Sequence, residues 1–114
     1  MKLLKQFSLL IILGFFSQGC SHTPEIPESP SVSFNKDVQP IIVSNCALSG
    51  CHDGNSEFGL NSFDEISKKT SPGNAHQSKI YTSIIDRSMP PSQPLSNQQA
   101  KLIYTWIMQG SKNN

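Results

Sequence analysis

The feature that most constrains this chain is a cluster of two thiols and one imidazole at residues 46–52. Four residues separate Cys46 from Cys51, and His52 follows directly. Neighbouring side chains diverge, so Cys51 and His52 suit two different targets better than one shared metal ion. A tetrahedral zinc site needs converging ligands and a fourth donor. The segment therefore predicts a bound group that is larger than a single ion.

A porphyrin is such a group. In a c-type site, two cysteines form thioethers with the rim of a haem, and the histidine that follows offers a ring nitrogen to the iron. The common motif is C-x-x-C-H, whereas residues 47–50 add length between the thiols. Small residues in this segment allow the extra chain between the two cysteines to bulge outward, and Gly50 permits backbone angles that other residues avoid. We therefore predict one covalent haem c, anchored by Cys46 and Cys51 and ligated by His52.

Two other interpretations of the same residues stay open. A disulfide between Cys46 and Cys51 would close a short loop and leave a haem-free structural or binding protein. Alternatively, His76 would complete a zinc clip with the two thiols.

Met89 is the predicted distal ligand of the iron, because an electron carrier generally closes both faces of its metal. It lies in residues 87–94, where three prolines within five positions restrict the backbone and can fix the place of a sulfur atom. Ligation by histidine and methionine raises the reduction potential. His76 is the rival ligand, but its polar loop is more typical of a solvated imidazole. Met108 fits a helical stripe and is expected to fill the core.

A family resemblance covers residues 34–114. The stretch Phe34-Asn-Lys-Asp-Val-Gln-Pro-Ile-Ile leads into the thiol segment, then come Met89-Pro90-Pro91 and a closing helix with Trp106-Ile-Met-Gln-Gly. In this order the motifs resemble those of bacterial monohaem cytochrome c domains. The resemblance implies an all-α domain wrapped around one covalent haem, which carries electrons and catalyses no reaction alone. It assigns attachment and iron-binding roles to the matching positions, which are Cys46, Cys51, His52 and Met89.

The first 19 residues have the pattern of an export signal. Lys2 and Lys5 precede an almost wholly apolar run at residues 7–16, which is shorter than the ~20 apolar residues that cross a bilayer. Ser17-Gln18-Gly19-Cys20 then resembles the cleavage site of bacterial lipoprotein precursors. We predict an exported protein whose lipidated Cys20 holds it on the inner or outer membrane, facing the periplasm. Conventional cleavage nearby would instead leave Cys20 as a free thiol or in an intermolecular disulfide.

Residues 20–33 form a predicted linker, with prolines at every third position from Pro24 to Pro30. Such a segment favours an extended chain, and at ~3.1 Å per residue it would hold the domain on the order of 40 Å from the membrane. Residues 34–114 then form one small domain. A domain of this size buries too little apolar surface to be stable by itself, so it needs a bound cofactor or a crosslink. The haem is therefore expected to be part of the core.

Charge excludes one class of partner. The formal net charge is +1, and removing Lys2 and Lys5 with the signal leaves seven basic and eight acidic side chains, or −1. This balance provides no broad basic field for nucleic acid. The expected partners are a redox donor and a redox acceptor. A small peroxidase or a metal-dependent hydrolase is disfavoured, because the chain supplies no obvious acid and base pair beside the haem.

Four helices are expected, without competing strands. Asp37 is the candidate N-cap of a first helix that runs into Cys46 and has an apolar face of Val38, Ile41 and Ile42. A capping box at residues 62–65 opens a short second helix to about Lys69, which Ser71-Pro72-Gly73 ends. Apolar residues mark one side of a third helix, namely Ile80, Tyr81, Ile84 and Ile85.

The last helix has the clearest pattern. Ser96 and Gln99 form a second capping box, and Gly110 suits the C-terminal stop. Its apolar stripe consists of Leu102, Ile103, Trp106 and Ile107. We expect this helix to pack across the first one, with Tyr81 and Trp106 as apolar walls of the haem site.

Overall fold

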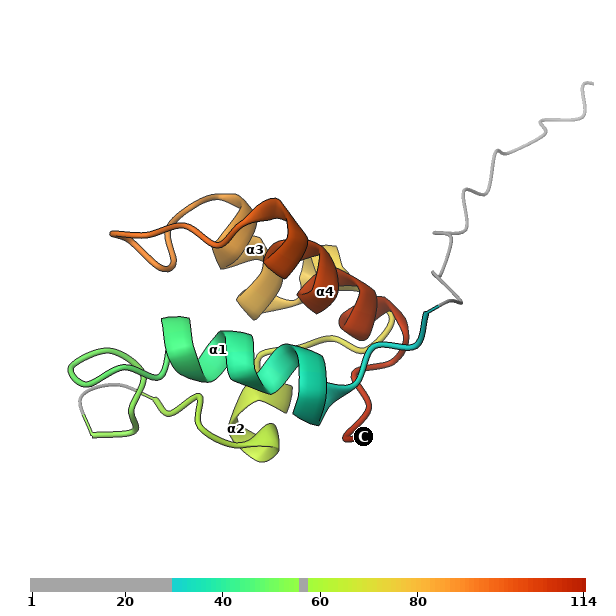
Figure 1. Ribbon diagram of the computed structural model, residues 1–114, viewed down its shortest axis with the longest axis horizontal. Coiled ribbons are helices and arrows are strands. Elements are labelled where there is room, and N and C mark those ends of the chain that lie inside the picture. The colour runs from blue at the N-terminus through green and yellow to red at the C-terminus, as the bar shows by residue number, and fades with distance from the viewer. Residues whose placement is uncertain (1–29, 56–57) are drawn as a thin grey trace, which may run out of the picture.

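The computed structural model describes residues 30–55 and 58–114, and this part of the chain is helical without any β-strand. The elements in chain order are a π-helical segment η1 (Phe34–Val38), α1 (Gln39–Asn45), α2 (Phe63–Ser67), a 3-10 segment η2 (Ala75–Gln77), α3 (Lys79–Ile85) and α4 (Asn97–Met108). They form one small domain in which η1 continues directly into α1 (Figure 1). The all-α prediction is confirmed for these residues.

The predicted export signal at residues 1–19, the predicted lipid attachment site at Cys20 and residues 21–29 of the predicted linker lie outside the described residues. Among the helices that the structure does describe, none has the length and apolarity needed to cross a membrane.

The first helix begins earlier than predicted. Ser33 is its N-cap, since its Oγ accepts a hydrogen bond from the Lys36 N–H at 3.3 Å. Asp37 lies within the first turn and accepts a hydrogen bond from the Ser33 N–H at 2.8 Å. The prediction that Asp37 is the N-cap was therefore wrong, because its carboxylate bonds back to the cap instead of forming it. Pro40 disfavours an α-helical bond at its own position, and the wider turns of η1 lie directly before it.

Asn114 satisfies other N–H groups at the start of this helix. Its side-chain oxygen accepts a hydrogen bond from Phe34 N–H at 2.8 Å, and its backbone oxygen accepts one from Asn35 N–H at 2.9 Å. The first amides of a helix have no partner within the helix itself. A long-range contact therefore completes the start of η1, where the end of the chain lies beside it (Figure 1).

The last helix forms as predicted, with both halves of its capping box present. Ser96 Oγ accepts from Gln99 N–H at 3.2 Å, and Gln99 Oε1 accepts from Ser96 N–H at 2.9 Å. Gly110 follows the helix with φ +100°, a conformation that other residues rarely adopt. Trp106 is 1% exposed, and its ring lies 5.4 Å from that of Phe34. The expected packing of the last helix against the first is confirmed.

The capping box of α2 is present as well, with Ser62 and Glu65 as its members. The helix ends at Ser67, because the next turn tightens and Lys69 N–H bonds to the Ile66 carbonyl at 2.9 Å. Buried apolar side chains from every helical element form one core, which includes Met108 as predicted. The core residues are Val32, Phe34, Val38, Ile41, Ile42, Leu60, Ile66, Ala75, Ile80, Ile84, Ile103, Trp106, Ile107 and Met108.

Candidate functional site

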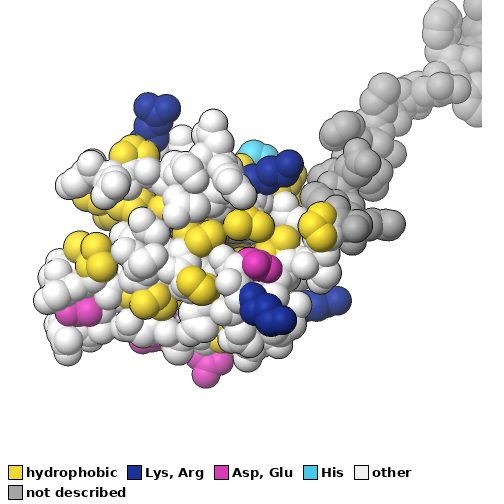
Figure 2. Space-filling view, viewed as in Figure 1, with side chains coloured by type: hydrophobic (Ala, Val, Ile, Leu, Met, Phe, Trp, Pro, Cys, Tyr) yellow, Lys and Arg dark blue, Asp and Glu magenta, His cyan; other side chains and the backbone are white. Residues whose placement is uncertain are grey.

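A cavity of about 570 Å³ opens between the loop after α1 and the loop after α3. Small-molecule and cofactor sites usually have volumes of ~300–1,000 Å³. These two loops extend from the same end of the domain (Figure 1). Hydrophobic side chains gather along the seam between the part of the domain that carries α1 and the part that carries α3 and α4 (Figure 2).

Every residue predicted to hold a haem lines this cavity. Cys46, Cys51 and His52 come from the loop after α1, whereas Met89 comes from the loop after α3. The fold therefore brings together two sets of candidate ligands that are far apart in the sequence.

The thiol loop starts at the C-terminal end of α1. Cys46 N–H still bonds to the Ile42 carbonyl at 2.8 Å, and His52 N–H bonds to the Cys46 carbonyl at 3.1 Å. Between them the chain bulges outward, with Leu48 48% exposed and open space around Gly50. Gly50 has φ +78°, so a larger residue there would be strained. The extra length between the thiols thus lies in solvent and leaves their path to the cavity clear.

The two thiols have different surroundings. Cys46 is half-buried and Cys51 is exposed, and both are free. Burial, together with the nearby Cys51, raises the pKa of Cys46 to about 11. Cys46 is therefore a neutral thiol at physiological pH. The alternative disulfide between the two residues is not formed in the structure.

The imidazole of His52 is oriented by Phe58. Its Nδ1 lies 3.3 Å from the Phe58 carbonyl oxygen, and the two rings stack with centroids 4.5 Å apart and an interplanar angle of 27°. Metal-binding histidines characteristically donate their second ring N–H to a carbonyl or carboxylate. In the tautomer with the proton on Nδ1, this contact leaves Nε2 as the nitrogen with a lone pair that can bind a metal.

Met89 is positioned by the end of α3. Its N–H donates to the Ser83 carbonyl at 3.0 Å, and Ser88 Oγ donates to the same carbonyl at 3.3 Å. Pro90 and Pro91 follow and also line the cavity. The Met89 side chain is 43% exposed, so its place is set by the backbone and not by core packing.

His76 does not reach the cavity. His76 belongs to η2, and the centroid of its ring lies 5.8 Å from that of Tyr81 and 6.3 Å from that of Tyr104. Within residues 30–55 and 58–114 there is no group of three or more His, Cys, Asp or Glu side chains that could hold a metal ion. The alternative zinc clip is therefore wrong, because His76 packs against the two tyrosines away from the thiols.

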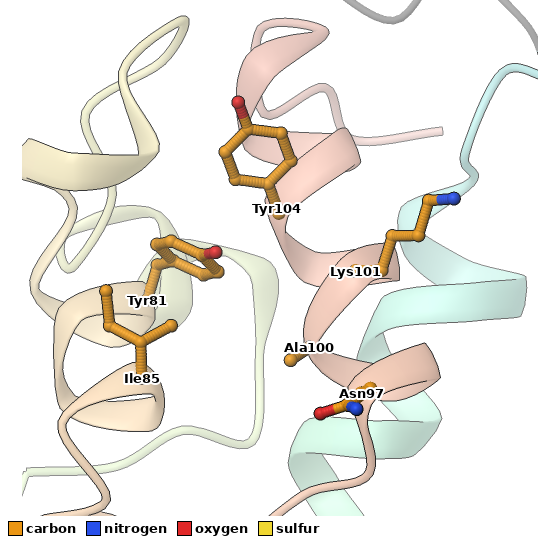
Figure 3. Close-up of a pocket in the computed structure, with 6 residues that line it drawn as sticks. All are labelled: Tyr81, Ile85, Asn97, Ala100, Lys101 and Tyr104. Atoms are coloured by element: carbon orange, nitrogen blue, oxygen red, sulfur yellow. The ribbon is translucent and has the colours of Figure 1, made fainter.

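The prediction of the cavity walls was also wrong. Tyr81 faces a second hollow between α3 and α4, where it lies opposite Tyr104 (Figure 3). Trp106 is buried in the core and does not line the cavity. Helical periodicity identified α3 but could not decide which of its faces meets the cavity. The apolar walls come instead from Leu60, Ile80 and Ile84.

Sequence reasoning missed the aromatic residue and the two cationic residues that line this site, which are Phe58, Lys69 and Lys79. Phe58 lies in a loop without periodicity, and the two lysines have the pattern of ordinary surface residues. Among the described residues that line the cavity, the lysines are the charged ones and none is acidic. The cavity is thus apolar on its walls and positive in formal charge.

In comparisons with known proteins, no family model, curated protein or solved structure matches this chain.

Proposed function

We propose that this protein is a monohaem c-type cytochrome, which carries single electrons between redox proteins and is not itself an enzyme. The observation that carries this proposal is that one cavity is lined by all four residues that would hold such a centre. These residues are Cys46, Cys51, His52 and Met89.

The donor set fits a haem better than a bare ion. The thiols and the imidazole do not converge as a metal-binding group among the described residues, as expected if they hold different parts of one large molecule. Cys46 and Cys51 would bind the porphyrin rim, and His52 and Met89 would bind the iron. When bound, a haem supplies an iron that gains and loses one electron. The ammonium of Lys79 at the cavity suits its propionate groups.

The remaining residues would keep the iron environment constant. The Phe58 carbonyl holds the His52 ring, and the Ser83 carbonyl holds the Met89 backbone. Leu60, Ile80 and Ile84 would exclude water from the porphyrin faces. In this proposal the helical domain wraps around the haem, which supplies the apolar mass that so short a domain lacks.

The decisive test is whether the exported protein carries a covalent tetrapyrrole. We expect a red product when the full chain is made in a bacterium with a cytochrome c maturation system. A pyridine haemochrome spectrum of thioether type and the mass of one added haem should accompany it. A colourless, folded product with a Cys46–Cys51 disulfide would refute the proposal and favour a haem-free binding or structural protein.

The distal ligand has its own test. Met89→Ala should keep the haem attached, lower the reduction potential and open the iron to small ligands such as carbon monoxide, because the sulfur ligand is lost. His76→Ala is the matched control and should leave the potential and the spectrum unchanged. The reverse pattern would assign the distal position to His76.

Export and lipidation complete the proposal. A lipid on Cys20 would hold the domain on the inner or outer membrane, facing the periplasm, where it meets its redox donor and acceptor. Cys20→Ser should release a soluble protein that still contains haem, measured by fractionation and haem staining. Continued membrane association of that variant would place the anchor elsewhere.

A further inference from the structure

Phe58 connects the predicted proximal ligand to a positive charge. Its ring stacks on that of His52, with centroids 4.5 Å apart, and Lys69 Nζ lies 3.9 Å from the same Phe58 centroid. Because both distances end at that centroid, the ammonium lies within about 8.4 Å of the imidazole centroid. All three residues line the cavity.

The surrounding backbone holds Phe58 and Lys69 in place. After Phe58, Gly59 packs so closely on Glu65 that a Cβ would overlap its carboxylate, and Leu60 N–H bonds to the His52 carbonyl at 2.9 Å. Lys69 follows α2, and its carbonyl accepts a hydrogen bond from Ile80 N–H at 3.1 Å. The contact between Lys69 and Phe58 thus joins segments that are each anchored to the rest of the domain.

We propose that Phe58 and Lys69 are positioning residues that orient His52 and raise the reduction potential of the haem, an inference that rests on the proposed function. Phe58 fixes the plane of the imidazole by stacking on it. Lys69 is attracted to the negative face of the Phe58 ring, as cations are to aromatic faces. The oxidised centre carries one more positive charge than the reduced one. A fixed ammonium nearby therefore favours the reduced form.

The size of the effect is an order-of-magnitude estimate. For an ammonium on the order of 10 Å from the charge on the iron and an effective dielectric constant of about 25, removing that ammonium shifts the ratio of oxidised to reduced protein about tenfold. For a one-electron couple, a tenfold shift equals about 59 mV. We therefore expect Lys69→Met to lower the potential by about this amount at low ionic strength, and by less in high salt.

Lys68→Met is the matched control. Lys68 is exposed and does not line the cavity, yet its replacement removes the same charge one position away. It should leave the potential nearly unchanged, and Lys69→Arg should preserve it because a guanidinium also binds an aromatic face. Equal potentials for Lys69→Met and Lys68→Met would overturn the inference.

Phe58→Leu tests the other half of the stack. It should shift the His52 ring-proton resonances and lower the reduction potential. It should also reduce the change in potential that Lys69→Met causes, because the Lys69 ammonium loses the aromatic ring that holds it near His52. Strictly additive effects of the two substitutions would contradict the coupling. Haem content is measured first on each sample: a product without haem refutes the proposed function and this inference together, whereas a haem protein with unaltered potentials refutes this inference alone.

Discussion

The reactivity of Cys46 distinguishes a haem-free chain from a haem-bearing one. Burial and the nearby Cys51 raise the pKa of Cys46 from 9.0 to about 11. The thiolate is the form that reacts with alkylating agents. A shift of about two units lowers its fraction about a hundredfold at any pH well below 9. In haem-free, reduced protein, we therefore expect Cys46 to be alkylated about a hundred times more slowly in the native state than in urea.

The assay is iodoacetamide labelling of native and urea-unfolded samples, followed by peptide mass spectrometry. The native rate at Cys46 should keep rising until the pH reaches about 11. A native midpoint near 9 would refute the reasoning, since it would mean that the thiol is not desolvated. In haem-loaded protein neither Cys46 nor Cys51 should react at any pH, because both sulfurs would be thioethers.

The same pKa shift predicts how stability depends on pH. Below pH 9 the thiol is protonated in both states, so Cys46 contributes no pH dependence there. As the pH rises from 9 to about 11, the unfolded chain has lost this proton while the native state still holds it, and unfolding becomes easier. The free energy of unfolding of haem-free protein should fall in this window. Cys46→Ala should abolish the part of that fall due to the thiol.

Two further substitutions test the framework of the site. Ser96→Ala removes the N-cap of α4 and should lower the free energy of unfolding by about 1 kcal/mol in urea titrations; an unchanged midpoint and slope would show that the cap is not formed in solution. Gly59→Ala should destabilise the domain by ~1–3 kcal/mol, because the new Cβ displaces the Glu65 carboxylate from Asn61 N–H and Ser62 N–H. Most of that cost should vanish in a Glu65→Ala background, and a full cost there would contradict the proposed clash.

The helices with local capping signals could be predicted from the sequence. Ser62 with Glu65 and Ser96 with Gln99 each satisfy helix-end amides within a few residues, so the pattern in the sequence matches the contact in space. The first helix differs. Asn114 bonds to its opening amides from the far end of the chain, and no local pattern reports such a contact.

The residues of the candidate site also fall into those that the sequence predicts and those that it does not. Cys46, Cys51 and His52 are close in sequence, and the chemistry of their side chains is enough to single them out. Phe58 and Lys69 were missed, because their role depends on how two loops without periodicity fold against each other. Tyr81 was misplaced since a helix has two faces, and only the packing of α3 decides which one meets the cavity.

The two sides of the cavity differ in how much folding they require. The thiols and His52 lie within residues 46–52, so an enzyme that attaches haem could recognise them in an extended chain while the helices are still unformed. Met89 reaches the cavity only when its loop forms a hydrogen bond to the end of α3. If the chain carries haem, the order of maturation is therefore set by its connectivity: covalent attachment can precede folding, and closure of the sixth coordination position reports that folding is finished.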